Sequence, residues 1–127
     1  MENPRIVFFG TPAFAAGMLK TLIEMKYQVV LAVTQPDKPV GRKKIIQRTP
    51  VAALADENQI DVLQPVRLKD MIDEILAYKP DLIVTCAYGQ FVPSRILEAP
   101  SLGCVNVHPS LLPKYRGGAP IQRAIMN

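Results

Sequence analysis

The sequence has 127 residues, of which 49% are hydrophobic and 20% charged, which predicts about one globular domain and excludes intrinsic disorder. Its longest aliphatic run, 29–33, is far shorter than the ~20 residues of a membrane-spanning helix. The net charge of +4 reflects two basic stretches, 37–48 and 114–123, where we expect an anionic partner unless the charges are only solvated surface.

Strands and helices are predicted to alternate along the chain. Short apolar segments rich in β-branched residues predict five strands, at 5–9, 28–33, 61–63, 81–86 and 103–108. Apolar residues at helical spacing predict helices at 12–26, 50–55, 71–76 and 94–97, with a last helix that begins near Pro120. Thr11 and Pro12 suit the N-cap and the first position of the first helix. The segment 34–49 is rich in turn residues and has no clear period.

This alternation predicts an α/β fold with a doubly wound, mostly parallel sheet. Because the last helix would stop barely two turns after Pro120, we expect the fold to be incomplete at its C-terminus. Cys86 and Cys104 lie in apolar strands, which predicts free buried thiols in a reducing cytoplasm. With two cysteines and one histidine, we expect no metal site.

The first strand ends at Gly10, at a strand–turn–helix junction that resembles a dinucleotide-binding turn. That fingerprint needs three glycines at fixed spacing, so that a pyrophosphate can approach the helix N-terminus. Bulkier residues at 11–15 occupy the places of the second and third glycines. A turn that packs the helix closely on the strand is therefore favoured over a nicotinamide site.

Two polar residues, Asn106 and His108, stand at the carboxyl end of the fifth predicted strand. Residues two apart in a strand point to the same face, so the amide and the imidazole should project together, away from Val105 and Val107. Ligands of open α/β sheets bind at this edge. An imidazole that moves protons and an amide that stabilises an oxyanion suit acyl transfer, although loop hydrogen bonding by the same pair remains the alternative.

No nucleophile accompanies this pair in the sequence. Ser110 lacks the glycine pattern of a nucleophile elbow, and Cys104 lies deeper in the strand, where we expect it to be part of the core. Direct transfer between two bound substrates is therefore favoured over a covalent enzyme intermediate.

Five segments together resemble the methionyl-tRNA formyltransferase family. They are Gly10-Thr11-Pro12-Ala13-Phe14-Ala15, Gln35-Pro36-Asp37-Lys38-Pro39-Val40-Gly41-Arg42, Ala87-Tyr88-Gly89-Gln90, Asn106-Val107-His108-Pro109-Ser110-Leu111-Leu112-Pro113 and Arg116-Gly117-Gly118-Ala119-Pro120-Ile121-Gln122-Arg123-Ala124. The Asn106–Pro113 segment is similar to one shared by folate-dependent formyltransferases in general. The first, second and fifth of these segments are typical of the tRNA-directed branch.

The resemblance implies transfer of a formyl group from the co-substrate 10-formyltetrahydrofolate to the amino group of methionyl initiator tRNA, at the start of translation. It implies a Rossmann-like formyltransferase fold and a cytoplasmic, monomeric parent protein with no metal and no membrane contact. His108 would transfer the proton and Asn106 would hold the oxyanion. Folate would contact Ser110, Leu111, Leu112, Pro113, Phe91 and Val92, and tRNA would contact Lys38, Arg42, Lys43 and Lys44.

The resemblance also predicts how much of the parent protein is present. Residues 1–127 correspond to the N-terminal part of the formyltransferase domain, whereas the family's third catalytic residue, an aspartate, and its C-terminal domain lie downstream. We therefore expect the chain alone to be inactive or nearly so. Two alternatives are a folate-dependent formyltransferase that acts on a small amine, such as a nucleotide or an amino-sugar, and a folate- or RNA-binding module without catalysis.

Overall fold

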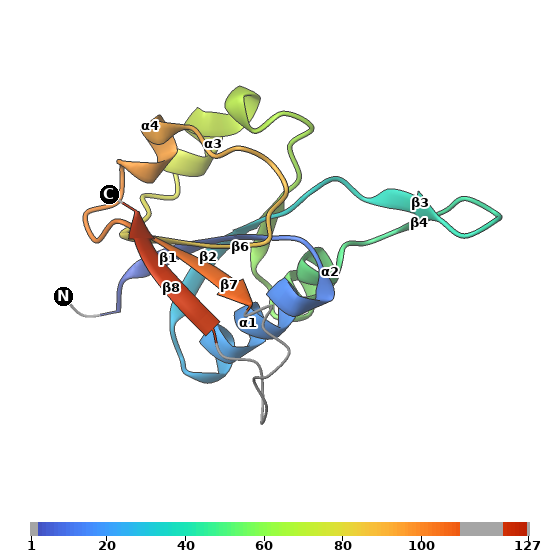
Figure 1. Ribbon diagram of the computed structural model, residues 1–127, viewed down its shortest axis with the longest axis horizontal. Helices are drawn as coiled ribbons and strands as arrows, with labels where there is room; N and C mark the ends of the chain where they lie inside the picture. The colour runs from blue at the N-terminus through green and yellow to red at the C-terminus, as the bar shows by residue number, and fades with distance from the viewer. Residues whose placement is uncertain (1–2, 110–120, 127) are drawn as a thin grey trace.

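The computed structural model describes residues 3–109 and 121–126, with side chains described as far as His108. Six strands form one sheet in the order β5-β2-β1-β6-β7-β8 (Figure 1). Their bounds are β1 Arg5–Gly10, β2 Gln28–Val33, β5 Asp61–Leu63, β6 Leu82–Cys86, β7 Cys104–Pro109 and β8 Ile121–Met126. The first five are parallel, and β8 pairs with β7 in the antiparallel direction. The predicted mostly parallel, doubly wound sheet is therefore confirmed.

Helices cover both faces of this sheet. On one face lie α1 (Ala13–Glu24) and α2 (Pro50–Glu57). On the other lie the 3₁₀-helix η1 (Leu68–Met71), α3 (Ile72–Leu76) and α4 (Ser94–Leu97) (Figure 1). Strand order reverses beside β1, which pairs with both β2 and β6. In doubly wound folds, ligands bind at the carboxyl ends of the strands at such a reversal.

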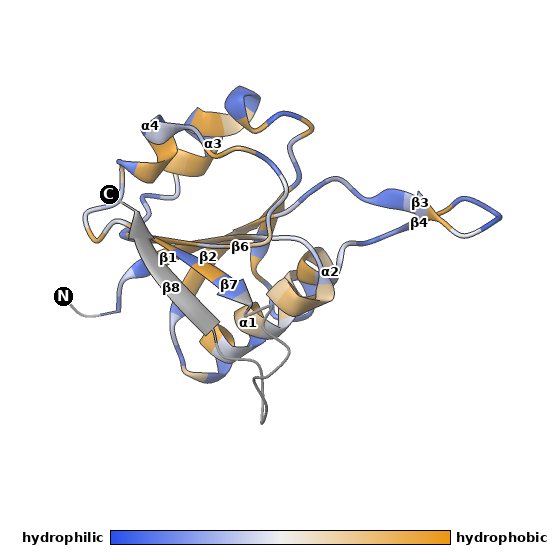
Figure 2. Cartoon of the chain, in the orientation of Figure 1, coloured by the Kyte–Doolittle hydropathy of each residue, from blue (hydrophilic) through white to orange (hydrophobic). Residues whose placement is uncertain are grey.

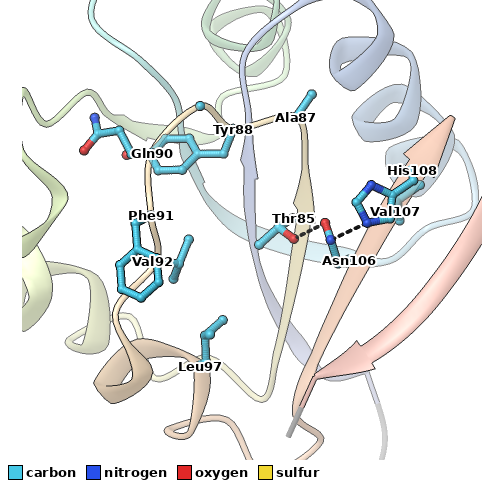
Figure 3. A pocket seen from close by; sticks show the side chains of 11 residues that line it. Thr85, Ala87, Tyr88, Gln90, Phe91, Val92, Leu97, Asn106, Val107 and His108 are labelled. Atoms are coloured by element: carbon cyan, nitrogen blue, oxygen red, sulfur yellow. Dashed lines mark hydrogen bonds between the residues drawn. The ribbon is translucent and has the colours of Figure 1, made fainter.

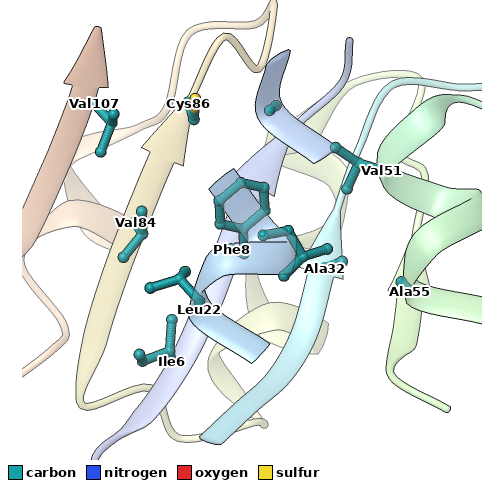
Figure 4. Close-up of a cluster of buried hydrophobic side chains, with 11 residues drawn as sticks. Ile6, Phe8, Leu22, Ala32, Val51, Ala55, Val84, Cys86 and Val107 are labelled. Carbon is teal, nitrogen blue, oxygen red and sulfur yellow. The ribbon is translucent and has the colours of Figure 1, made fainter. Parts of the chain in front are cut away.

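Strand β1 shows why the strands are apolar on both faces. Ile6 and Phe8 pack in the cluster beneath α1 and α2, which Figure 4 shows, and Val7 and Phe9 pack in the cluster on the opposite face. All four side chains are at most 1% exposed. Burial of each contributes about 1.5–3 kcal/mol to folding, so an uninterrupted apolar run is favoured at the centre of a covered parallel sheet.

The turn after β1 packs closely, as the residue pattern predicted. A Cβ atom added at Gly10 would lie 2.7 Å from the Cβ of Ala15 and 2.8 Å from the carbonyl oxygen of Cys86. Glycine therefore permits the helix to contact the strand. The predicted role of Thr11 as helix cap is wrong, because Pro12 is the N-cap residue and the Thr11 hydroxyl donates to the carbonyl oxygen of Tyr88 at 2.7 Å.

Two other local predictions differ from the structure. The segment 34–49 contains an antiparallel hairpin of β3 (Lys38–Val40) and β4 (Ile45–Gln47), which has no periodic signal because all six of its strand residues are exposed. The helix predicted from Pro120 is wrong for 121–126, which form β8. Pairing with β7 gives β8 hydrogen-bond partners along its length, whereas a helix this short is marginal by itself.

Candidate functional site

A cavity of about 380 Å³ lies at the carboxyl ends of β6 and β7 (Figure 3). Its lining is mainly apolar. Three polar side chains, Thr85, Asn106 and His108, line the side formed by the two strands. The lining comprises Thr85, Ala87, Tyr88, Gly89, Gln90, Phe91, Val92, Leu97, Asn106, Val107 and His108. The cavity thus lies at the carboxyl edge of the sheet, beyond the two strands that follow β1 in the sheet order.

Asn106 and His108 converge at this cavity, as the strand spacing predicted. The side-chain nitrogen of Asn106 lies 2.6 Å from Nε2 of His108 (Figure 3). Val107 points to the opposite face, where it is 3% exposed within the cluster beneath α1. The pair therefore joins a hydrogen-bonding amide to an imidazole at the rim of the sheet.

Thr85 completes a row of three polar side chains. It is the register partner of Asn106 on the neighbouring strand, and its hydroxyl donates to Oδ1 of Asn106 at 2.7 Å. Sequence reasoning missed Thr85. The sequence does contain a signal that could have identified it. Thr85 is a hydroxyl residue within β6, and the other buried residues of that strand, Ile83, Val84 and Cys86, are apolar.

The loop after β6 forms the apolar wall opposite this row. Phe91 and Val92, which the resemblance predicted as folate contacts, both line the cavity, and Phe91 is 85% exposed. Such a large exposed aromatic side chain beside a cavity is available to a flat ligand. The other predicted folate contacts, Ser110, Leu111, Leu112 and Pro113, lie outside the described residues.

Tyr88 belongs to the same loop, lines the cavity and packs in the buried cluster on that face of the sheet. Its ring is perpendicular to that of Phe9, with centroids 5.3 Å apart and an interplanar angle of 79°. The phenol oxygen is buried and has no hydrogen-bond partner among the residues that the structure describes, and burial raises the pKa of Tyr88 to about 12. Tyr88 is therefore a neutral packing residue of the site.

Neither cysteine supplies a nucleophile to the cavity. Both side chains are fully buried, and burial raises the pKa of Cys86 and of Cys104 to about 11. At neutral pH each is a thiol, which is the unreactive form. The predicted core position of Cys104 is confirmed.

The predicted tRNA contacts cluster on the β3–β4 hairpin, which extends away from the sheet (Figure 1). Lys38 lies on β3, and Arg42, Lys43 and Lys44 form its turn, where Gly41 has φ +76°. All four basic side chains are exposed. Figure 2 shows the hairpin as largely hydrophilic with a short hydrophobic stretch, to which Ile45 and Ile46 contribute side chains that are 61% and 63% exposed.

The fifth basic residue of the segment, Arg48, has a different role. Its guanidinium forms a bidentate pair with Asp56 at 2.9 Å and also donates to Asp37 at 3.4 Å. Desolvation raises the pKa of Asp37, but hydrogen bonds from Gln64 and from the Thr49 N–H, together with Arg48, outweigh it and lower the pKa. Arg48 thus links the base of the hairpin to α2, which contains Asp56.

Among residues 3–109 and 121–126, no three His, Cys, Asp or Glu side chains gather closely enough to hold a metal ion. Within those same ranges, no helix has the length and apolarity needed to cross a membrane.

Comparison with known proteins gives relatives over almost the whole chain. Methionyl-tRNA formyltransferases of Bacillus thuringiensis subsp. konkukian (strain 97-27) and Bacillus cereus (strain B4264) are each 57% identical to it over 124 residues. These matches cover 96% of this chain and 40% of each relative. The chain therefore spans about 40% of the length of these curated relatives.

Solved structures with the same fold include two phosphoribosylglycinamide formyltransferases. The protein from Streptococcus pneumoniae TIGR4 has a TM-score of 0.64 at 14% identity, over 98% of this chain and 74% of its own. The protein from Bacillus halodurans has a TM-score of 0.63 at 14% identity, and the match covers 97% of this chain and 80% of that protein's chain. Identities this low show a shared fold. Residues 4–127 match the family described as Formyl transferase, and the chain belongs to that family.

Proposed function

We propose that this chain is the N-terminal part of a methionyl-tRNA formyltransferase domain, and that Asn106 and His108 act in formyl transfer from 10-formyltetrahydrofolate to the amino group of methionyl initiator tRNA. The observation that carries the proposal is the convergence of the two side chains, 2.6 Å apart, at the cavity beyond β6 and β7. The names of relatives at 57% identity support the tRNA-linked substrate. In the cell the reaction belongs to translation initiation in the cytoplasm, carried out by a monomeric protein.

Formyl transfer requires these side chains to move a proton and to stabilise an oxyanion. The amine nitrogen forms a bond to the formyl carbon, the bond from that carbon to the folate nitrogen breaks, and a proton moves from the amine to the folate nitrogen. His108 carries that proton, since an imidazole exchanges protons near neutral pH. Asn106 has two N–H groups on Nδ2, so one can donate to His108 while the other stabilises the developing oxyanion.

The cavity has the composition that a reduced folate requires. Its volume of about 380 Å³ and its mainly apolar walls suit a flat ring system, and Thr85, Asn106 and His108 supply polar groups on the side of the strands. Phe91 and Val92 form part of this wall. By resemblance, Ser110, Leu111, Leu112 and Pro113 would complete the folate contacts.

The basic side chains of the hairpin suit the tRNA backbone. Lys38, Arg42, Lys43 and Lys44 are exposed, and each phosphate that such a side chain neutralises makes affinity more sensitive to salt. Arg48 is excluded from this set, because its donors already pair with Asp37 and Asp56.

Folate binding can be tested on the 127-residue chain itself. Titration with tetrahydrofolate, followed by ¹H–¹⁵N NMR, should shift the resonances of Asn106, His108, Phe91 and Val92. Resonances of the hairpin, such as that of Ile46, serve as the internal reference. Saturable shifts confined to the hairpin, or no shifts at all, would exclude a folate site in this cavity.

We expect turnover to require a longer protein, because the resemblance places a third catalytic residue downstream. We would join this chain to the sequence that follows the matched segment in the Bacillus cereus relative and measure formylation of methionyl-tRNA. His108→Ala and Asn106→Ala should each lower kcat at least a hundredfold, whereas Asn58→Ala, at an exposed position after α2, should not. Unchanged turnover in His108→Ala would refute the assignment.

The same assays separate the alternative functions. Formylation of a small amine in preference to methionyl-tRNA would identify the chain as part of a small-molecule formyltransferase. Saturable folate or tRNA binding without formylation of any amine by the joined protein would identify a binding module. We expect residues 1–127 alone to bind folate without measurable turnover.

A further inference from the structure

Thr85 is an unusual residue for its position. Strands of a parallel sheet that is covered on both faces are apolar, and Ile83, Val84 and Cys86 follow this rule. Thr85 is 8% exposed in the same strand. Burial of a hydroxyl without a hydrogen-bond partner is unfavourable, so the partner of Thr85 accounts for its presence in this strand.

The partner of Thr85 fixes which end of the Asn106 amide faces the cavity. A carboxamide has two ends of nearly equal shape, of which the oxygen only accepts hydrogen bonds and the nitrogen only donates them. The Thr85 hydroxyl lies 2.7 Å from Oδ1, which leaves Nδ2 2.6 Å from Nε2 of His108. In this orientation the donor end faces the imidazole (Figure 3).

We propose that Thr85 is a positioning residue, whose hydroxyl keeps the Asn106 amide with its nitrogen toward His108 and the cavity. This inference rests on the proposed function, because holding an oxyanion requires the donor end of Asn106. It also assigns a tautomer: Nε2 of neutral His108 accepts from Asn106, so the ring proton resides on Nδ1. Without the hydroxyl, the oxygen of Asn106 loses its partner and the amide populates both orientations.

The first test is spectroscopic and needs no activity. In the 127-residue chain, ¹⁵N NMR should show that the neutral form of the His108 ring has Nε2 unprotonated, and that Asn106 has two resolved side-chain amide protons. Thr85→Val, which removes the hydroxyl at nearly constant shape, should accelerate exchange of these protons about tenfold and change the His108 tautomer ratio. Thr85→Ser should restore both signatures.

A second buried threonine serves as a control. It shows whether the effects of Thr85→Val come from the contact with Asn106 or from the loss of any buried hydroxyl. Thr34 is fully buried, and its hydroxyl lies 2.8 Å from that of Thr49 and 3.5 Å from that of Thr11, neither of which is hydrogen-bonded to Asn106 among the described residues. Thr34→Val should therefore leave the Asn106 and His108 signatures unchanged. The proposal is overturned if Thr85→Val leaves them unchanged too, or if the wild-type ring carries its proton on Nε2.

The second test measures the consequence for catalysis. In the joined protein, Thr85→Val should lower kcat about tenfold with less than a twofold change in the KM for the folate donor, and Thr85→Ser should recover the loss. An equal loss in kcat with Thr85→Ser would refute positioning by the hydroxyl. If the wild-type joined protein does not formylate methionyl-tRNA, the proposed function fails, and the NMR signatures still decide whether Thr85 orients Asn106.

Discussion

The side-chain nitrogen of Gln90 donates to the side-chain oxygen of Gln35 at 2.7 Å. Gln90 belongs to the wall of the cavity, and Gln35 follows β2 at the start of the segment that leads into the hairpin. Gln64 donates to the backbone oxygen of Gln35 and to Asp37, which also accepts from Arg48. The cavity wall and the base of the hairpin are therefore parts of one hydrogen-bonded network.

Replacement of Gln90 tests how much this network contributes to stability. Besides Gln35, its side chain donates to the carbonyl oxygen of Pro65 and accepts from the Leu68 N–H. Gln90→Met keeps the length of the side chain but removes all three bonds, so the free energy of unfolding should fall by about 2–3 kcal/mol. Urea denaturation measures this change.

The control for Gln90 is Gln28→Met, at an exposed position at the start of β2. That variant should change the free energy of unfolding by less than about 0.5 kcal/mol. Equal stability of the two variants would mean that the bonds of Gln90 contribute nothing to folding.

Replacement by phenylalanine should have opposite effects on stability at Tyr88 and at Tyr78. The buried hydroxyl of Tyr88 has no partner in the described part of the chain, so Tyr88→Phe should leave stability unchanged or raise it by up to about 1 kcal/mol. The hydroxyl of Tyr78 donates to Asp61 at 2.8 Å, so Tyr78→Phe should lower stability by up to about 1 kcal/mol. Thermal unfolding of both variants measures the difference, and a destabilised Tyr88→Phe would reveal a partner for that hydroxyl.

The fold and the central pair of the site were predictable because both depend on local patterns. Alternation of apolar strands with amphipathic helices requires only sequence spacing, and the face shared by Asn106 and His108 follows from the pleat of a single strand. The carboxyl edge of a parallel sheet then fixes where they meet. Their catalytic roles came from resemblance, since spacing alone left hydrogen bonding in a loop as an alternative.

The contacts that sequence reasoning missed join residues far apart in the chain. Thr85 contacts Asn106 across 21 positions, and Gln90 contacts Gln35 across 55. Neither separation has a periodic signature. The hairpin was missed for a different reason, because its exposed strands have no buried face and therefore no alternation of apolar and polar residues.

Two arginines of the hairpin segment should affect tRNA binding in different ways. Arg42 is exposed in the turn, so Arg42→Gln should weaken binding to tRNA and reduce by about one the slope of log affinity against log salt. Arg48 pairs internally, so Arg48→Gln should loosen the base of the hairpin and weaken binding without changing the slope. Filter binding at several salt concentrations measures both, and a reduced slope in Arg48→Gln would show that this residue contacts phosphate directly.

The buried thiols predict a loss of stability in alkali. Unfolded cysteine has a pKa near 8.5, whereas burial raises the pKa of Cys86 and Cys104 to about 11. Because the folded-state pKa is the higher one, this stability is fully present below about pH 8.5 and is lost as pH rises toward 11. Between these values the unfolded chain releases two protons that the folded chain retains, which lowers the free energy of unfolding by about 2.7 kcal/mol per pH unit.

Denaturation in urea between pH 8 and pH 11 measures that slope, and the double variant Cys86→Ala with Cys104→Ala isolates the thiols. Both side chains are fully buried, so the variant should be less stable at neutral pH, where it leaves two small cavities. Its stability should nevertheless fall less steeply with pH, because tyrosines and lysines titrate in both proteins whereas thiols titrate only in one. Parallel curves for the two proteins would mean that the folded thiols ionise as readily as the unfolded ones, which is incompatible with their burial on either side of the sheet.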